Sequence, residues 1–327
     1  MRCLAFAEEW KKSSKNIFFI SNCKDNNIVK KITQNGFNFI LVKDSYPNPD
    51  DIKVTLSIIN KNDLGGSSWV LIDGYNFDVT YQNEIKKNGN KLIFIDDIAH
   101  LSNYSADIIV NQNISAEKLN YNCSEKTELL LGSRYTIIRD DFLKFGRTDK
   151  RKFSKPRNLL ITLGGSNPFN FSSKLVKFIN LYKTSKLNIK VVVGSLAKHN
   201  KMDLDSFYHE IDFVQIKPND MPRLMAWADI AISSGGSTPW ELAFMGLPGL
   251  VICFAENQIH SMNRLHKYGS IINLGWYEDL TNKRLLSDME KLLNNKLSRI
   301  NMSMKGMKLI DGNGRKRIID TMKYFHS

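Results

Sequence analysis

Long apolar stretches are missing from this sequence of 327 residues, in which no run of about 18 apolar residues occurs. The first ten residues pattern as an amphipathic helix that carries two glutamates, which a signal peptide would not have. Hydrophobic residues make up 42% and charged residues 24%, as in soluble globular proteins. We therefore expect a cytoplasmic protein without stable membrane insertion, long enough to fold as two domains.

Cysteine is scarce, and the four cysteines are widely separated, without a C-x-x-C pair or a histidine at ligand spacing: Cys3, Cys23, Cys123 and Cys253. This excludes a disulfide framework and a zinc site by pattern, and we expect reduced, mostly buried thiols. The sequence also lacks G-x-S-x-G, the P-loop, a complete G-x-G-x-x-G and H-E-x-x-H. Serine hydrolases, P-loop NTPases, Rossmann oxidoreductases and zinc proteases are therefore disfavoured, and we expect neither a metal nor a cofactor.

The net charge is +13, but the lysines are scattered and no arginine-aromatic array or nucleic-acid motif is present. We therefore expect no nucleic-acid partner. A basic surface also suits an anionic sugar nucleotide, or loose contact with an anionic membrane face.

Apolar strand patterns alternate with helix patterns along the chain, which predicts parallel sheets covered on both faces. A basic, non-periodic segment, residues 146–157, is typical of a linker, and the alternation restarts after it. We predict an N-terminal α/β domain over residues 1–145, a C-terminal α/β domain over residues 158–310, and a final helix over residues 311–327 that packs back on the first domain. In the tail, helices are expected around Asp279 to Leu293 and Asp311 to Tyr324, with residues 302–307 between them.

The most informative stretch is residues 228–253, in which a strand over Ile230 to Ser233 leads through a glycine turn into a helix, followed by a second strand from Leu250. Thr238 is the expected N-cap, Pro239 the first helical residue, and Glu241 the closing residue of a capping box. The helix is expected to run to about Met245. One βαβ unit results.

Two interpretations of this turn remain open. Gly235 and Gly236 either make only a tight turn, or they present backbone N–H groups at a helix N-terminus to a phosphate or diphosphate. Glu241 either closes the capping box, or accepts both hydroxyls of a ribose one turn beyond the diphosphate.

Polar residues at other predicted strand ends form a second group of candidates, since ligands bind beyond the carboxyl ends of parallel strands. They are Asp73, Asp96, Asp97 and His100 in the first half, and Asn257 and Gln258 in the second. The predicted strand over residues 158–163 leads into a second glycine turn before a helix, at Gly164-Gly165. A lone Asp at a strand end is commonly a turn or helix cap, although the clustering favours one or two of these residues facing a ligand. None of the four candidates in the first half, His100 included, is marked as a catalytic base. Asn257 and Gln258 either bond sugar hydroxyls or cap the following helix.

Several segments together carry a family resemblance: residues 163–168 (LGGSNP), 232–248 (ISSGGSTPWELAFMGLP), 255–258 (AENQ) and 311–314 (DGNG). Residues 73–75 (DGY), 95–100 (IDDIAH) and 131–135 (LGSRY) extend it over most of the chain. The sequence resembles the UDP-2,4-diacetamido-2,4,6-trideoxy-altropyranose hydrolases of pseudaminic acid biosynthesis, which are related to the lipid-II-forming N-acetylglucosaminyltransferases. The resemblance implies the GT-B fold, with two Rossmann-like doubly wound domains facing a cleft.

The resemblance also implies roles for residues. The diphosphate of UDP would lie at Gly235, Gly236, Ser237 and Thr238, and the ribose at Glu241. Residues 164–166, which are Gly164, Gly165 and Ser166, would line the cleft, with Gln258 beside the substrate. Tyr75 and Asn257 match the family's active-site tyrosine and amide, so they are the expected catalytic residues.

One departure concerns the N-terminus. The family begins with a strand and a G-x-G-H loop with a catalytic histidine, followed by a helix like residues 1–7 (MRCLAFA). This sequence starts at the helix, and an α/β domain that opens on a helix also lacks the strand before it. We therefore expect a misplaced start codon or a truncated product.

Three functions follow as hypotheses. The first is an inverting hydrolase that releases UDP from a diacetamido-trideoxy hexose, acting as a monomer. The second is a GT-B glycosyltransferase with a similar donor, which would release UDP only when an acceptor is present. The third is a catalytically silent protein that binds the nucleotide sugar.

Overall fold

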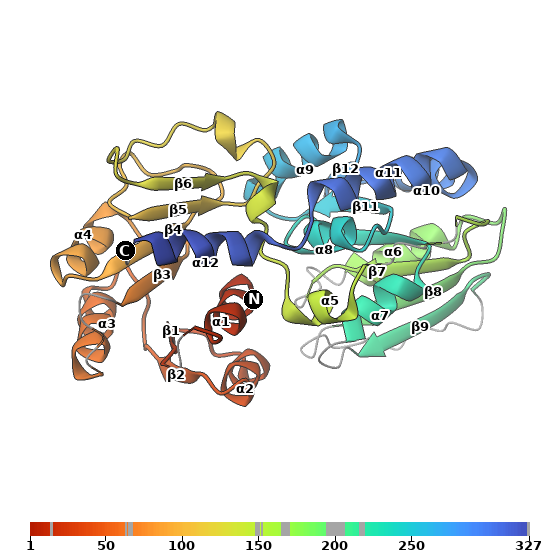
Figure 1. The fold of residues 1–327 in the computed structure, drawn as a ribbon. Coiled ribbons are helices and arrows are strands. Elements are labelled where there is room, and N and C mark those ends of the chain that lie inside the picture. Colours follow the sequence, from red (N-terminus) through yellow and green to blue (C-terminus); the bar gives the residue numbers. More distant parts are fainter. Residues whose placement is uncertain are drawn as a thin grey trace. The chain divides into compact units, whose positions relative to one another are not determined.

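The computed structural model describes residues 1–13, 16–62, 64, 68–147, 151, 153–164, 171–193, 207–215 and 220–325. They form two compact units, the first made of Met1–Arg139 with Asn313–Ser327 and the second of Asp140–Gly312 (Figure 1). Residues 140–145, which the sequence analysis placed in the first domain, group with the second unit.

The first unit contains, in chain order, α1 (Arg2–Trp10), β1 (Phe18–Ser21), α2 (Asn26–Gln34), β2 (Asn38–Leu41), α3 (Pro49–Lys61), β3 (Trp69–Asp73), α4 (Val79–Lys87), β4 (Lys91–Ile95), β5 (Ile108–Asn111), η1 (Ala116–Lys118), β6 (Glu128–Leu131), η2 (Ser133–Tyr135) and α12 (Gly314–Tyr324). The second contains α5 (Asp140–Phe145), β7 (Asn158–Thr162), α6 (Phe171–Ile179), β8 (Asn188–Val193), β9 (Glu210–Gln215), α7 (Asp220–Trp227), β10 (Ile230–Ser234), α8 (Thr238–Phe244), β11 (Gly249–Cys253), α9 (Glu256–Tyr268), β12 (Ile272–Trp276), α10 (Asn282–Asn294) and α11 (Lys296–Leu309).

The sheet of the second unit is parallel, with its strands in the order β12-β11-β10-β7-β8-β9. The chain starts in the middle at β7, moves outward to β9, and then returns to β10 on the other side. Buried strands such as β10 and β11 have no exposed residue, as expected of a sheet covered on both faces. Leu250 and Ile252 pack with α6 and α10, whereas Gly249, of opposite parity, lies against Leu242 of α8.

The first unit is parallel as well, but its described strands form a four-stranded sheet, β3-β4-β5-β6, and a separate pair, β1-β2. Helices α1 and α12 cover one face of the larger sheet, where Ile318 and Met322 join Phe6 in one core cluster (Figure 1). Arg315 is almost fully buried there and donates from Nη1 to the carbonyl of Ala5 at 2.8 Å. The final helix is thus an integral part of the first unit.

The elements that were not predicted from the sequence are β6, β12, α5 and α11, together with the short 3-10 helices η1 and η2. Residues 302–307 were expected to separate two helices, but they lie inside α11. The packing of α11 against α8 requires glycine at position 306, because a Cβ there would lie 3.0 Å from the Cα of Ala243 on α8. Close approach of two helices therefore explains a glycine that looks like a helix breaker in the sequence.

Candidate functional site

The strand order of the second unit reverses between β7 and β10, and parallel α/β sheets bind ligands at such a point, beyond the carboxyl ends of the strands. Gly164, which begins one predicted glycine turn, and the Gly235-Gly236 turn both lie there. Gly164 follows β7 with φ +87°, a backbone conformation that favours glycine, and its ideal Cβ position is 3.7 Å from the Ser234 hydroxyl at the end of β10. Gly165 and Ser166 lie outside the described residues.

The two glycines after β10 differ in their surroundings. Gly235 is buried, donates its N–H to the Ile252 carbonyl at 2.9 Å, and would carry a Cβ 2.9 Å from Oε1 of Gln258. Gly236 is exposed, and a Cβ there would meet nothing within 4 Å. Gly235 therefore allows β10 to approach α9, while Gly236 leaves its backbone open to solvent.

The start of α8 differs by one residue from the sequence-based expectation. The N-cap is Ser237, not Thr238, and Thr238 is already the first helical residue. The Ser237 side chain makes no capping hydrogen bond and is exposed, and its backbone is αR, not extended. The capping box centred on Thr238 is therefore wrong, because the turn enters the helix without a side-chain cap.

Glu241 lies in the first turn of α8 and is only 7% exposed. Its neighbours in the helix, from Pro239 to Phe244, are all buried too. A buried carboxylate must be hydrogen-bonded or paired with a cation, whereas a carboxylate that caps a helix from the surface is stabilised by water.

The two amide residues at the start of α9, Asn257 and Gln258, differ in their surroundings. Gln258 accepts the N–H of Phe254 through Oε1 at 2.9 Å, so its carbonyl oxygen stabilises the entry into α9. Asn257 is exposed beside it, and the N-cap of α9 is Ala255 without a side-chain cap bond. The sequence left two roles open for these amides, a bond to sugar hydroxyls or a cap on α9. The Gln258 oxygen stabilises the start of α9, whereas Asn257 is not the N-cap of that helix.

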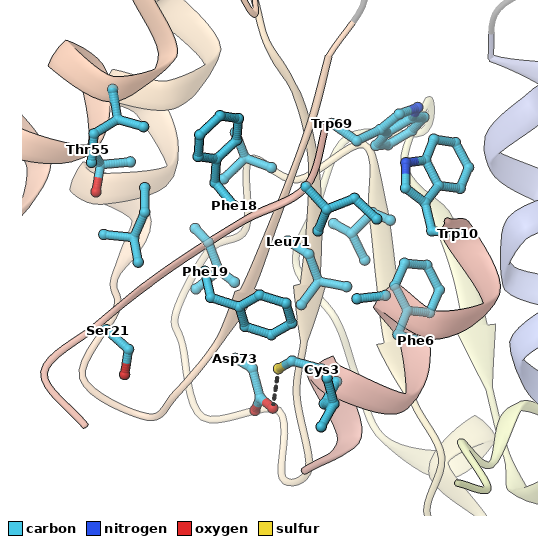
Figure 2. Close-up of a pocket in the computed structure, with 18 of the residues that line it drawn as sticks. Cys3, Phe6, Trp10, Phe18, Phe19, Ser21, Thr55, Trp69, Leu71 and Asp73 are labelled. Carbon is cyan, nitrogen blue, oxygen red and sulfur yellow. Dashed lines mark hydrogen bonds between the residues drawn. The ribbon is translucent and has the colours of Figure 1, made fainter. Parts of the chain in front are cut away.

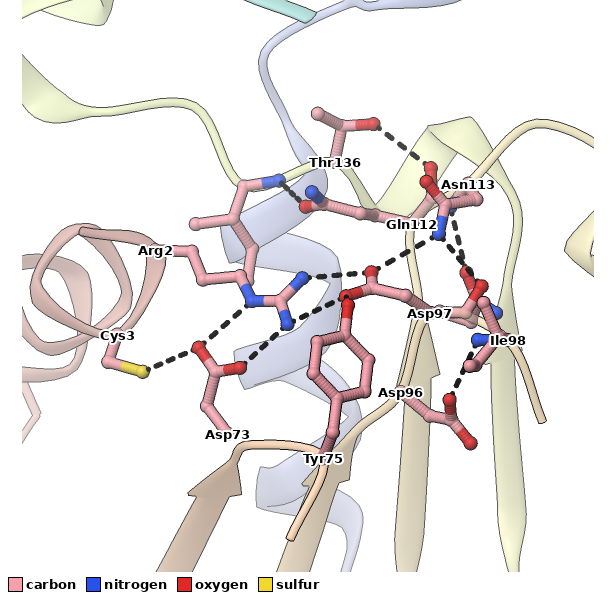
Figure 3. A network of polar contacts seen from close by, with 12 residues as sticks. Arg2, Cys3, Asp73, Tyr75, Asp96, Asp97, Ile98, Gln112, Asn113 and Thr136 are labelled. Atoms are coloured by element: carbon pink, nitrogen blue, oxygen red, sulfur yellow. Dashed lines mark hydrogen bonds and ion pairs between the residues drawn. The ribbon is translucent and has the colours of Figure 1, made fainter. Parts of the chain in front are cut away.

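In the first unit, polar residues from three strand ends meet around Arg2 (Figure 3). The guanidinium donates to Asp73 from Nε at 2.9 Å and from Nη2 at 2.6 Å, and to Asp97 from Nη1 and Nη2, each at 2.9 Å. The Tyr75 hydroxyl donates to Asp97 Oδ2 at 2.7 Å, and the Asn113 amide donates to Asp97 Oδ1 at 3.2 Å. Tyr75 itself is 44% exposed, so its ring remains accessible.

Charge pairing governs the titration of this cluster. Burial alone would raise the pKa of Asp73, but its hydrogen bonds and charge interaction with Arg2 outweigh burial and hold that pKa below its usual range. Burial raises the pKa of the Cys3 thiol, which donates to Asp73 Oδ2 at 3.0 Å. Asp73 is therefore an anion in a structural ion pair, not a general base with a raised pKa.

Asp96 has a different role from its neighbour. Its buried carboxylate accepts the N–H groups of Ile98 and Ala99 at 2.8 and 3.1 Å and the hydroxyl of Tyr104. Ala99 has a positive φ of 53°, which this turn stabilises. His100 lies 3.2 Å from the Tyr75 carbonyl through Nε2. The sequence indicated that Asp73, Asp96 and Asp97 lie at one edge of the sheet. It did not indicate that Arg2 of α1 binds Asp73 and Asp97.

The cysteine expectation needs correction: all four thiols are free, but Cys253 alone is buried and the other three are half-buried. Among the described residues, no three His, Cys, Asp or Glu side chains are grouped as a metal site would require. No helix in the part of the chain that the structure describes is both long and apolar enough to cross a membrane.

The two parallel-sheet α/β units define a GT-B-like protein. Solved structures of this fold are similar over the whole chain: MurG of Acinetobacter baumannii (TM-score 0.66, 13% identity, 99% of this chain and 95% of that one) and a putative UDP-N-acetylglucosamine 2-epimerase of Listeria monocytogenes (TM-score 0.68, 12% identity, 100% and 93%). At these identities the likeness concerns the fold alone.

Sequence comparison then identifies the family. The glycosyltransferase family 28 C-terminal domain matches residues 159–322, which make up half of the chain. The chain therefore belongs to that family. These residues include both described glycine turns, at Gly164 and at Gly235-Gly236, and continue into α12.

Three curated relatives are similar to this chain over 59% to 79% of its length. They are an uncharacterized protein of Methanocaldococcus jannaschii (31% identity over 79% of this chain and 53% of the relative), the spore coat polysaccharide biosynthesis protein SpsG of Bacillus subtilis (28%, 59% and 57%), and the pseudaminic acid cytidylyltransferase and UDP-2,4-diacetamido-2,4,6-trideoxy-beta-L-altropyranose hydrolase of Helicobacter pylori (23%, 70% and 41%). The chain thus spans about half the length of the curated relatives it matches.

Proposed function

We propose that the second unit binds a UDP-sugar at the switch point between β7 and β10. The observation that carries this proposal is that Gly164 and the Gly235-Gly236 turn follow the two strands flanking that point, within the residues matched by the family. In this proposal the open backbone of Gly236, with Ser237 and Thr238, holds the diphosphate. Glu241 accepts the ribose hydroxyls, and Gln258 supports the turn through its contact with Gly235. Gly165 and Ser166 complete the proposed cleft lining.

For the reaction we propose hydrolysis. Water attacks the anomeric carbon of the sugar, the bond from that carbon to the diphosphate oxygen breaks, UDP leaves with the electron pair, and one proton of the water is released to solvent. Tyr75 and Asn257 are the proposed catalytic residues, both exposed in the structure. The hydrolase named in the Helicobacter pylori relative supports a diacetamido-trideoxy hexose as the sugar, and a place in nonulosonic acid biosynthesis.

Membership of a glycosyltransferase family favours a second candidate, transfer of the sugar to an acceptor hydroxyl. The two reactions share the proposed UDP site and differ in the group that attacks the anomeric carbon. Turnover in the presence and absence of an acceptor therefore separates them.

The test of the reaction is UDP release measured with a coupled assay. We expect steady UDP release from UDP-2,4-diacetamido-2,4,6-trideoxy-altropyranose in buffer alone, with inversion at the anomeric carbon seen by NMR. Release only on addition of a sugar or lipid acceptor would replace hydrolysis by transfer. Binding of the nucleotide sugar without turnover under either condition would overturn both.

The UDP site has its own test, by calorimetry with UDP. Replacing Glu241 with glutamine preserves its shape but exchanges a carboxylate oxygen for an amide donor, so we expect Glu241→Gln to weaken UDP binding ~10-fold or more. Glu290→Gln, an exposed substitution on α10, is the matched control and is expected to leave affinity unchanged. Equal affinity of the Glu241→Gln variant and the parent protein would remove Glu241 from the proposed ribose site.

A further inference from the structure

The Tyr75 hydroxyl points at Asp97 in the first unit, and this contact decides which kind of hydrogen bond Tyr75 can offer a ligand (Figure 3). The hydroxyl donates to Asp97 Oδ2 at 2.7 Å. A hydroxyl has one proton and two lone pairs, whereas an ionised carboxylate can only accept. As long as Asp97 is ionised, every further hydrogen bond of the Tyr75 oxygen is therefore one that this oxygen accepts.

The contacts of Asp97 keep its carboxylate ionised. Oδ1 accepts from Arg2 Nη1 at 2.9 Å and from Asn113 Nδ2 at 3.2 Å, while Oδ2 accepts from Arg2 Nη2 at 2.9 Å and from Tyr75. A carboxylate has about four lone-pair sites, so these donors leave no site for a proton. The side chain of Asp97 is only 14% exposed, which strengthens these bonds relative to bonds in water.

Arg2 is held in turn by Asp73, which accepts from Nε at 2.9 Å and from Nη2 at 2.6 Å. Asp73 also lines an apolar cavity of about 730 Å³ bordered by α1, β1 and β3, and the Cys3 thiol donates to it at 3.0 Å (Figure 2). Hydrogen bonds between charged groups are stronger in apolar surroundings than in water. The guanidinium is therefore fixed on its Asp73 side, and its other side fixes Asp97.

The main chain of Tyr75 is held by the same turn that provides Asp97. His100 Nε2 lies 3.2 Å from the Tyr75 carbonyl, and because a carbonyl only accepts, Nε2 is the nitrogen that carries the proton. The two rings meet edge to face, with their centroids 5.8 Å apart. Asp96 stabilises the turn itself by accepting two of its backbone N–H groups. Tyr75 is thus 44% exposed, yet it is held at its hydroxyl and at its carbonyl.

An oxygen that can only accept distinguishes an N–H group from an oxygen atom at the same place in a ligand. A ligand hydroxyl can turn its proton toward an acceptor or away from a donor, whereas an amide nitrogen can only donate and an ester oxygen can only accept. An ester oxygen facing Tyr75 would bring two acceptors together. Sites built to hydrogen-bond a polar group of the substrate reject an analogue that lacks it.

We propose that the Tyr75 oxygen accepts the N–H of an acylamino group on the sugar, and that Asp97 is the positioning residue that fixes this polarity. The inference rests on the proposed function, whose sugar carries two acetamido groups. It adds a direction to the contact, because a tyrosine that gives its proton to Asp97 does not protonate the departing UDP. The sugar is selected by its nitrogen substituents.

The test compares probes that differ in a single N–H group. The reference probe is UDP-2,4-diacetamido-2,4,6-trideoxy-altropyranose with a methylene group in place of the anomeric oxygen, which prevents hydrolysis. Two further probes carry an acetoxy group in place of the acetamido group at carbon 2 or at carbon 4, so the carbonyl remains while oxygen replaces N–H. Calorimetry gives the affinities for the three probes and for UDP.

In the parent chain we expect one of the two acetoxy probes to bind ~10-fold or more weakly than the reference probe. Tyr75→Phe removes the acceptor, so we expect it to bind these two probes equally. Tyr324→Phe, at an exposed tyrosine of α12, is the matched control and is expected to keep the preference. Asp97→Asn places an amide donor opposite the phenol and turns the phenol proton toward the ligand, so the preference is expected to disappear or reverse.

The affinity for UDP separates this inference from the proposed function. Equal binding of all three probes by a parent chain that binds UDP overturns the inference alone, whereas no binding of UDP overturns the proposed function and the inference with it. A preference that survives Tyr75→Phe assigns the N–H to another acceptor and also overturns the inference. Retention of both the parent Tm and the preference by Asp97→Asn overturns the positioning role, and if that variant does not fold, Tyr75→Phe decides.

Discussion

At the residue scale, Arg2 has the most consequential contacts in the first unit. It is bonded to two carboxylates that come from different strand ends, with its side chain 21% exposed. Removing either anion leaves the other to balance the guanidinium, while removing the cation leaves two like charges close together. The pairing therefore fixes the start of α1 to the sheet edge that also carries Tyr75.

The pH dependence of stability follows from Asp73. Its pKa is lowered in the folded state, so its contribution to the free energy of unfolding is present above its ordinary pKa of ~3.9 and is lost as the pH falls through the folded value. We expect Asp73→Asn to be less stable than the parent chain at pH 6, and the difference to shrink as the pH falls below ~4. Urea unfolding at several pH values measures it.

The control for this experiment is Asp50→Asn, which breaks an exposed ion pair with Lys53. An exposed pair contributes ~0.5 kcal/mol or less, so the control should differ little from the parent chain at any pH. A stability difference for Asp73→Asn that stays constant from pH 6 to pH 2 would contradict the assigned ion pair.

Residues of this kind mark the limit of reading a site from sequence. Strand-end residues such as Asp73 and Asp97 could be predicted to share an edge, because the carboxyl ends of parallel strands do so. Their partner Arg2 could not, because its reach depends on where α1 docks. The shift of the α8 cap from Thr238 to Ser237 has a local cause, since either hydroxyl residue suits an N-cap.

At the element scale, the two glycines of the turn between β10 and α8 differ in role: Gly235 is packed against α9, and Gly236 is exposed. Gly235→Ala would place a Cβ 2.9 Å from Gln258 Oε1 and 3.0 Å from Met262 Cγ, so the Gln258 side chain must shift away from the Phe254 N–H that it accepts, or β10 and α9 must move apart. We expect a loss of ~1 to ~2 kcal/mol in the free energy of unfolding, measured by urea titration. Gly236→Ala, which meets nothing within 4 Å, is the matched control and should change stability by less than ~0.5 kcal/mol.

A stability loss from Gly236→Ala as large as that from Gly235→Ala would mean that the turn, not the contact with α9, sets the requirement. The same pair also informs the ligand proposal. Because Gly236 is the exposed member, its substitution is expected to act on UDP affinity and not on stability.

Most helices and strands could be predicted because their apolar periodicity is strong, as in β7, β8 and β10. The missed elements have physical explanations. Two residues of β6 are exposed on a strand at the edge of the sheet, which weakens the apolar signal. Helix α11 contains Gly306, which allows close approach to Ala243 of α8. A contact between two helices cannot be read from the sequence.

At the scale of the whole molecule, the alternation of strands and helices was sufficient to predict parallel α/β architecture, and the structural relatives confirm the GT-B-like fold. Strand order was not predictable from that alternation, because the same alternation suits several orders. It is the order that locates the switch point of the second unit.

The first unit is discontinuous in sequence, since Met1–Arg139 and Asn313–Ser327 belong to it while Asp140–Gly312 forms the second. Its core includes Ile318, Ile319 and Met322, and Arg315 is bonded to α1. During synthesis these residues emerge after the whole of the second unit. The order in which the units mature on the ribosome is therefore the reverse of their order in the chain: the second unit can close its core while the first still awaits its final helix.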